Sequence, residues 1–156
     1  MASGPSLDLQ LTGFAFAGAG PLFGALNLQV AGGEVVALLG ASGVGKTTLL
    51  RMIAGLQGGY GGKILVGGVP ATEAPAPGLV FQDARLLPWL TVADNLRAVS
   101  ADITAERIAG LLGQVGLAGT ESLWPRQLSG GMQRRLALAR ALSVNAGLLL
   151  LDEPFV

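Results

Sequence analysis

The sequence predicts an α/β fold in which antiparallel strands open the chain, buried strands form the core and a helical segment interrupts them. Three observations lead to this prediction. Leucines alternate with polar residues near the N-terminus, a continuous apolar run ends in a glycine-rich loop, and a second apolar run ends in two carboxylates. Alternation is typical of a half-buried strand, whereas a continuous apolar run is typical of a strand covered on both faces.

The opening segment predicts two antiparallel strands. Residues 7–11 alternate leucine with Asp8 and Gln10, and residues 26–30 repeat this period after a turn that contains glycine and proline. Such strands have one apolar and one polar face, so the pair is expected to cover a core on one side only.

A strand, a glycine loop and a helix are expected next. The apolar run Val35–Leu39 predicts a buried strand that ends at Gly40, and residues 48–54 have helix-forming character. Glycines and prolines punctuate the following stretch and leave two further short strands, at residues 63–66 and 79–82.

The middle third predicts helices. Thr91 begins a capping box for a helix that extends to about Val99, and Thr104 begins a second helix with an apolar stripe. After a Ser-Gly-Gly break, residues 132–142 predict a third helix, and Leu148–Leu151 predicts a buried strand.

The composition excludes several classes of function. The 156 residues suffice for one domain, and ten basic and ten acidic residues leave no net charge to attract nucleic acid. Without cysteine or histidine, a metal must bind to oxygen ligands. The uncharged residues 9–33 are interrupted by glycines and a proline, and no basic residue precedes them. We therefore expect neither a membrane span nor a secretion signal, and we predict a cytoplasmic chain.

The loop after the first buried strand has the spacing of a phosphate-binding loop, with two glycines five positions apart followed by Lys and Thr. Glycines let backbone N–H groups point at phosphate oxygens, and the next helix adds its positive N-terminal end. Lys46 is expected to neutralise the outer phosphates, and the Thr47 hydroxyl to bind magnesium. The alternative is a plain glycine-rich turn, which the flanking strand and helix disfavour. The expected ATP-binding residues are Gly40, Ala41, Ser42, Gly43, Val44, Gly45, Lys46, Thr47 and Thr48.

The second apolar run delivers Asp152 and Glu153 to the carboxyl end of a core strand, where ligands bind in α/β sheets. Asp152 is placed to hold magnesium, directly or through water. Glu153 is the candidate catalytic residue that orients and polarises the attacking water in phosphoryl transfer. Two solvated acids at a strand end are the alternative for this motif alone, and the accompanying phosphate loop favours the catalytic interpretation.

The segment Leu128-Ser129-Gly130-Gly131-Met132 begins the third predicted helix, with Ser129 as a natural N-cap and two glycines that leave backbone donors exposed. The alternative from the residues alone is a well-capped helix start with no further function. With this segment beside the phosphate loop and the acidic pair, the sequence resembles the ATPase subunits of ABC transporters, whose signature reads Leu-Ser-Gly-Gly-Gln. Met132 replaces the Gln. The resemblance covers nearly the whole chain and implies a P-loop NTPase fold of ABC type, with an antiparallel β subdomain and a small helical subdomain.

The resemblance implies ATP and Mg²⁺ as cofactors and a second ATPase subunit, most simply another copy, as a partner. In the family, Ser129, Gly130 and Gly131 of one subunit would close over the γ-phosphate bound by the other. Gln82 stands where the family has a glutamine that senses magnesium and the attacking water, so it is a candidate catalytic residue and a candidate metal ligand.

The adenine contact is open among three aromatic residues. Phe16 stands where the family places a ring against adenine, which makes it a candidate ATP-binding residue. Phe14 and Phe23 lie near it in sequence, and ordinary core packing is the alternative for Phe16.

Residues 86–92 resemble the corresponding segment of importers for nitrate, sulfonates and taurine. This likeness implies membrane-embedded permease subunits as partners, a solute-binding protein as an indirect partner, and a peripheral location at the cytoplasmic face of the membrane. Trp89 is a candidate for the groove that receives a permease helix, whereas core packing is the alternative for Trp89 and Trp124. The arginines near 134–140 predict a solvated or ion-paired helix face, so we expect no nucleic-acid partner.

The resemblance divides the chain into a core at about 1–85 and 145–156 and a helical subdomain at about 86–144. The chain ends at Val156, whereas family members continue through another core strand and a switch histidine. We therefore expect a C-terminally truncated domain whose core sheet is incomplete at the C-terminus.

Three functions follow as hypotheses from the resemblance. The first is an ATP-binding, energy-coupling subunit of an ABC importer, which hydrolyses ATP in a dimer when complete. The alternatives are a truncated nucleotide-binding module without sustained hydrolysis and a soluble ABC ATPase with no role in transport.

Overall fold

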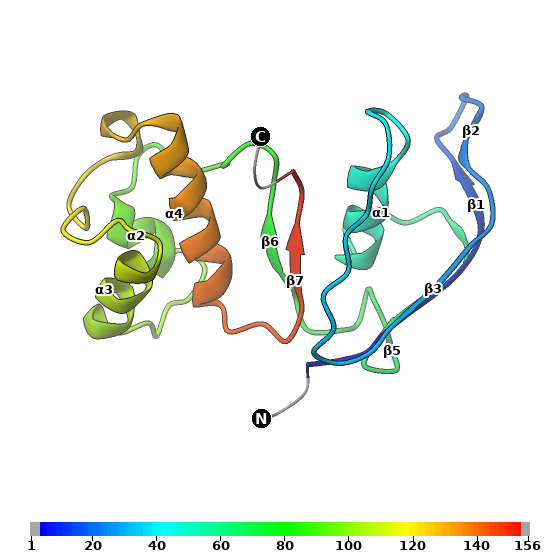
Figure 1. Cartoon of the computed structure of the whole chain (residues 1–156), viewed down its shortest axis with the longest axis horizontal. Coiled ribbons are helices and arrows are strands. Elements are labelled where there is room, and N and C mark those ends of the chain that lie inside the picture. The colour runs from blue at the N-terminus through cyan, green and yellow to red at the C-terminus, as the bar shows by residue number, and fades with distance from the viewer. Residues whose placement is uncertain (1–3, 154–156) are drawn as a thin grey trace. The chain divides into compact units, whose positions relative to one another are not determined.

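The computed structural model describes residues 4–153, which form two compact units (Figure 1). The N-terminal unit ends at Pro77, and the C-terminal unit begins at Gly78. No helix in this described range is long and apolar enough to cross a membrane.

The N-terminal unit is a twisted antiparallel sheet with one helix. Strand β1 (Leu7–Ala15) pairs with β2 (Pro21–Phe23), β3 (Leu26–Val30) and β4 (Gly61–Val66), and β4 pairs in turn with β5 (Val69–Pro70). Leucines 7, 9 and 11 of β1 are buried while the residues between them are more exposed, as expected from the alternation. The predicted antiparallel pair is confirmed, with Leu7 opposite Val30 and Leu11 opposite Leu26.

Helix α1 (Lys46–Ile53) confirms the helix predicted after the glycine loop. Its buried side chains are Leu49, Met52 and Ile53, which follow the three- and four-residue spacing of one helix face. The helix packs against β4, so the loop that precedes α1 is anchored to the sheet through this helix.

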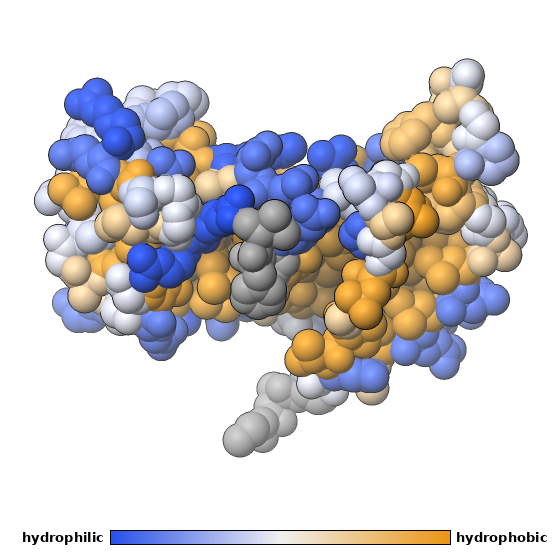
Figure 2. Space-filling view, turned by 45° about the horizontal axis from the view of Figure 1, so that its top comes forward, coloured by the Kyte–Doolittle hydropathy of each residue, from blue (hydrophilic) through white to orange (hydrophobic). Residues whose placement is uncertain are grey.

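The predicted strand Val35–Leu39 is wrong. These residues form no regular structure, and Val35 and Leu39 are 96% and 93% exposed. A strand is held by ladder hydrogen bonds, and none of the strands within residues 4–153 pairs with this segment. Apolar surface is visible on the N-terminal unit in Figure 2, and Val35, Val36 and Leu39 are among its exposed large hydrophobic residues.

The C-terminal unit combines a two-stranded parallel sheet with a helical cluster. Strand β6 (Gly78–Val80) pairs with β7 (Leu149–Leu151) along its whole length. The helices are α2 (Val92–Arg97), α3 (Ala105–Gln114), a 3₁₀ turn η1 (Pro125–Gln127) and α4 (Gly130–Ser143). Helix α4 lies beside β6 (Figure 1). Ala137 and Ala141 of the helix form a buried cluster with Val80 of the strand.

Side-chain caps start all three of these helices at the predicted residues. The hydroxyl of Thr91 accepts a hydrogen bond from the backbone N–H of Asp94, that of Thr104 from Arg107, and that of Ser129 from Met132. Helix α2 ends at Arg97 rather than at about Val99, and β6 ends at Val80 rather than at 82 because pairing with β7 stops there. The helices enclose an apolar core whose fully buried members include Val92, Leu96, Ile108, Leu111, Leu112 and Leu136.

The alternative of core packing is wrong for Trp89, which is 67% exposed. Trp124 is 38% exposed and is also not a core residue. The buried core of the helical cluster consists of aliphatic side chains, and neither tryptophan belongs to it.

Candidate functional site

The phosphate loop has backbone conformations that favour glycine. Gly43 has φ of +81° and Gly45 has φ of +105°, a region that L side chains rarely adopt. A Cβ added to Gly45 would also lie 3.0 Å from Cδ1 of Phe23 and 3.2 Å from Cδ2 of Leu22. Gly45 therefore serves two purposes, because it lets the chain turn into α1 and lets the loop approach β2.

The start of α1 differs from that of the other helices. Gly45 is its N-cap, no side chain caps it, and its first turn contains no acidic residue. Backbone N–H groups at an uncapped helix start carry partial positive charge, which makes them suitable donors for an anion.

Lys46 bridges the loop. Its Nζ donates to the carbonyl oxygen of Gly40 at 2.9 Å and to that of Ala41 at 3.0 Å. The ammonium therefore lies beside the carbonyls at the start of the loop, on a flexible side chain, and a phosphate oxygen is a stronger partner for it than a neutral carbonyl.

The three phenylalanine rings differ in how much of their surface is exposed. Phe14 is buried, whereas Phe16 is 47% exposed and packs edge-to-face on Phe14 with ring centroids 4.9 Å apart. Phe23 lies 6.0 Å from Phe14 and approaches Gly45 of the loop. Phe16 is thus the ring with the most surface free for another aromatic group.

The acidic pair continues the parallel sheet of the C-terminal unit. The backbone N–H of Asp152 donates to the carbonyl of Val80 at 2.9 Å, and the Asp152 side chain is buried. Glu153 has φ of 48°, so the chain turns sharply there. Gln82 Nε2 donates to Glu153 Oε2 at 2.8 Å, which brings together two of the predicted site residues from positions 71 apart.

The metal ligands suggested by the sequence all offer oxygen. They are the Thr47 hydroxyl, the Gln82 amide and the Asp152 carboxylate, a donor set that fits the preference of Mg²⁺ for oxygen. Within residues 4–153 no three acidic side chains cluster into a site that would hold a cation on protein ligands alone.

The glycine pair at the start of α4 is open. A Cβ added to Gly130 or to Gly131 would meet nothing within 4 Å, although neither residue has the positive φ that requires glycine. Packing inside the chain therefore gives no reason for two glycines behind the Ser129 cap.

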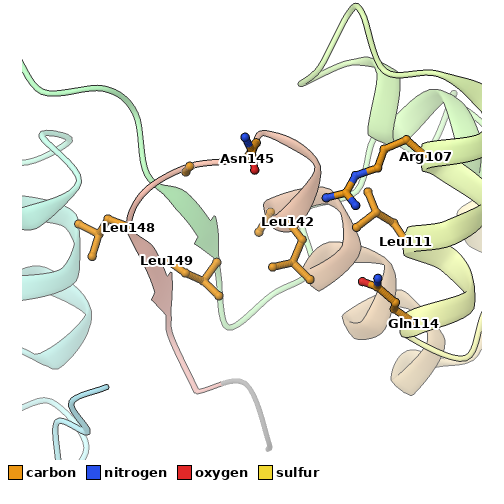
Figure 3. A pocket seen from close by; sticks show the side chains of 9 residues that line it. Arg107, Leu111, Gln114, Leu142, Asn145, Leu148 and Leu149 are labelled. Atoms are coloured by element: carbon orange, nitrogen blue, oxygen red, sulfur yellow. The ribbon is translucent and has the colours of Figure 1, made fainter. Parts of the chain in front are cut away.

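A surface pocket of about 180 Å³ lies elsewhere in the C-terminal unit (Figure 3). It opens at the start of β7, between α3 and the end of α4, whereas Asp152 follows the other end of β7. The pocket is lined by no glycine and by none of the predicted site residues, so it is distinct from the predicted nucleotide site. Its lining includes Arg107, Leu111, Gln114, Leu142, Asn145 and Leu149.

Sequence reasoning missed the role of Arg140. The helix-face prediction is wrong for this residue, because Arg140 is half-buried and donates to the carbonyls of Ala84 and Arg85. Its position was a signal, since it lies four residues after buried Leu136 and three after buried Ala137, on the buried side of α4.

Comparison with known proteins places this arrangement in a family. Residues 23–156 match the family model described as ABC transporter. The chain is 45% identical over 155 residues to an aliphatic sulfonates import ATP-binding protein of Burkholderia lata, covering 97% of this chain and 56% of that protein. It is 50% identical over 141 residues to a protein of the same description from Paraburkholderia xenovorans, covering 88% of this chain and 53% of that protein.

A relative with a different named solute is equally similar. The chain is 51% identical over 140 residues to a sulfate/thiosulfate import ATP-binding protein of Chromobacterium violaceum, covering 82% of this chain and 37% of that protein. The chain spans about half the length of the curated relatives that it matches.

Proposed function

Because this chain belongs to the ABC transporter family, we propose that it binds Mg-ATP as the ATP-binding, energy-coupling subunit of an importer. The observation that carries the proposal is the phosphate loop, in which two left-handed glycines, a bridging lysine and an uncapped helix start occur together. The lysine offers a positive charge to a triphosphate, the helix start offers backbone donors, and the glycines let the backbone approach it.

Residues 40–48 bind the triphosphate in this proposal. The backbone N–H groups of the loop and of the first turn of α1 donate to phosphate oxygens, and Lys46 exchanges its two carbonyl partners for the outer phosphates. The exposed ring of Phe16 stacks against adenine, since Phe14 is buried and Phe23 is occupied beside Gly45.

Magnesium would be held by side-chain oxygens of Thr47, Gln82 and Asp152. When bound, the metal neutralises charge that develops on the phosphates. Glu153 orients and polarises the attacking water, and the Gln82 amide holds the Glu153 carboxylate in place through their 2.8 Å hydrogen bond. Hydrolysis depends mainly on such positioning.

A second copy of the chain is the proposed partner for the glycine pair. The open surface at Gly130 and Gly131 and the start of α4 behind Ser129 leave room for the phosphates of an ATP that another subunit binds. We expect ATP to promote self-association of the Glu153→Gln chain, and we expect Gly130→Asp to abolish it by adding bulk and negative charge.

Gly110→Asp is the matched control for this association. Gly110 is also an exposed helical glycine with nothing within 4 Å of an added Cβ, but it lies in α3. Sedimentation with and without ATP measures the result. A dimer that forms equally well with Gly130→Asp contradicts the assignment of Ser129, Gly130 and Gly131.

Membrane-embedded permease subunits are the proposed site of attachment, which makes the chain peripheral at the cytoplasmic face. Trp89, exposed after Pro88 at the entry to α2, is the aromatic anchor for a permease helix. The relatives named above import sulfonates or sulfate, so we propose a sulfur oxyanion as the solute, delivered by a solute-binding protein.

The test of the proposal is an affinity measurement with a fluorescent ATP analogue and magnesium. Lys46→Ala is expected to weaken binding by about 10- to 150-fold, because a charge-assisted hydrogen bond to phosphate contributes about 1.5–3 kcal/mol. Lys63→Ala is the control, since Lys63 is exposed on β4 of the same unit and outside the loop. Equal affinity in Lys46→Ala and the unchanged chain would contradict the assignment of residues 40–48 as the phosphate loop.

A further inference from the structure

Arg140 is a half-buried cation in the C-terminal half of α4. Desolvation by burial lowers the pKa of the Arg140 guanidinium, yet arginine remains charged in proteins. A charge that has lost water is stable only when hydrogen-bond acceptors replace that water. The acceptors of Arg140 therefore indicate what this residue does.

Those acceptors are two neighbouring backbone carbonyls. Nη1 donates to the carbonyl of Arg85 at 2.8 Å, and Nη2 donates to that of Ala84 at 3.0 Å. The planar guanidinium presents two parallel donors, which a single ammonium group does not reproduce. Arg140 thus ties α4 to one short turn that lies 55 residues earlier in the sequence.

The turn that Arg140 holds is strained. Arg85 has φ of 44°, in the left-handed region that non-glycine residues seldom occupy. Its own guanidinium lies over the Phe81 ring, with Cζ 4.1 Å from the ring centroid. A backbone of this kind persists only where surrounding contacts determine it, and Arg140 supplies two of those contacts.

The strained turn begins directly after Gln82. Only Asp83 separates Gln82 from Ala84, and the exposed Gln82 side chain has little packing of its own to fix it. Its side-chain hydrogen bond to Glu153 at 2.8 Å therefore depends on where the turn holds its backbone.

We infer that Arg140 is a positioning residue, which fixes the turn at 83–85 and so keeps Gln82 against Glu153. Helix α4 begins at the Ser129 cap, so one rigid element joins the open glycine pair to this turn. The importance of the position rests on the proposed function, in which Gln82 and Glu153 act on the attacking water.

The test follows the side-chain amide resonance of Gln82 in ¹⁵N–¹H spectra of the full chain. Glu153→Ala gives the reference position for a broken Gln82–Glu153 hydrogen bond. Arg140→Ala is expected to move the Gln82 resonance toward that reference. Arg140→Lys keeps the charge but loses the two paired donors of the guanidinium. It is expected to move the Gln82 resonance in the same direction by a smaller amount. Arg134→Ala removes an exposed arginine of the same helix and is expected to leave it unchanged.

A merely structural role would have a different outcome. General loosening of the unit would shift backbone amides throughout α2 and α3, whereas positioning shifts resonances around 82–85 and leaves those helices unchanged. A Gln82 resonance that stays in place in Arg140→Ala overturns the inference. If Arg140→Ala does not fold, Arg140→Lys decides, and an unmoved Gln82 resonance there overturns it.

Affinity for ATP without magnesium separates this inference from the proposed function. The phosphate loop belongs to the N-terminal unit and Gln82 contributes only through the metal, so Arg140→Ala is expected to change the affinity for metal-free ATP by less than about twofold. If the unchanged chain binds no Mg-ATP, the proposed function fails, while the Gln82 resonance still reports whether Arg140 holds the turn.

Discussion

Two uninterrupted apolar runs, Val35–Leu39 and Leu148–Leu151, have the same character in the sequence and different fates in the structure. Strand β7 forms within the second run, pairs with β6 and leaves Leu150 only 6% exposed. The first run pairs with none of the described strands, and Leu39 is 93% exposed. An apolar run therefore becomes a strand only where another strand completes its ladder.

The starts of the helices show the same contrast between the two units. Helices α2, α3 and α4 of the C-terminal unit all have side-chain caps, whereas α1 of the N-terminal unit has none. Each of these caps satisfies one backbone donor of its helix, and no side chain does so at α1.

The largest expected difference lies between the two apolar runs. Leu150→Ala is expected to lower the free energy of unfolding by about 2–5 kcal/mol, because it leaves a cavity under β7. Leu39→Ala is expected to change it by less than about 0.5 kcal/mol, because the side chain is in water. Urea unfolding followed by tryptophan fluorescence reports the first effect, since Trp89 and Trp124 both belong to the C-terminal unit. Thermal unfolding followed by far-ultraviolet circular dichroism compares both variants. Equal losses of stability in Leu150→Ala and Leu39→Ala would contradict the difference between the two runs.

A smaller effect is expected at the turn into α1. Gly45→Ala places a side chain at φ of +105° and against Phe23, which we expect to cost about 1–3 kcal/mol. Gly20→Ala is the control in the same unit, because an added Cβ there meets nothing within 4 Å. Thermal unfolding measured by circular dichroism compares them. A Gly45→Ala chain as stable as Gly20→Ala would mean that the loop does not need this conformation.

The helix caps are expected to contribute less. Thr104→Ala removes the acceptor for the backbone N–H of Arg107, and we expect a loss of about 1 kcal/mol. Ser122→Ala removes an exposed hydroxyl in the same unit and is expected to have an effect below about 0.5 kcal/mol. Urea unfolding of both variants measures the difference, and identical midpoints would contradict the importance of capping in this unit.

The smallest expected effect is a dependence on pH at α2. The hydrogen bond from Thr91, helped by the one from Arg97, lowers the pKa of Asp94 below its usual value of 3.8. A lowered pKa in the folded state means stability that is present above the usual pKa and is lost as the pH falls through the folded one. The side chain of Asp94 is 42% exposed, so water screens most of this contribution.

Asp94→Asn tests this dependence. We expect the free energy of unfolding of the unchanged chain to fall more than that of Asp94→Asn between about pH 6 and about pH 3, where the carboxylate takes up a proton. Parallel pH profiles for the two chains would show that Asp94 contributes nothing.

The helix starts could be predicted from local sequence patterns. Thr91, Thr104 and Ser129 cap their helices as expected, because capping involves only residues three positions apart. Gln82, which the resemblance implies, donates a hydrogen bond to Glu153, which the end of the second apolar run predicts.

The failures concern contacts between distant residues. Whether Val35–Leu39 forms a strand depends on a pairing partner that its own residues do not specify. The sequence predicts a solvated or ion-paired helix face for Arg140 and does not indicate its acceptors, which lie 55 and 56 positions away. The division into a core and a helical subdomain at 86–144 stays a prediction.

Hydrogen exchange with and without Mg-ATP tests the central claim most directly, namely that the backbone of the phosphate loop binds the triphosphate. Mg-ATP is expected to slow exchange of the amides at residues 40–49, and to leave those of α3 (residues 105–114) unchanged, because α3 is in the other unit. Lys46→Ala should lose most of this protection. Unaltered exchange at residues 40–49 under saturating Mg-ATP, or equal slowing in α3, would contradict the account.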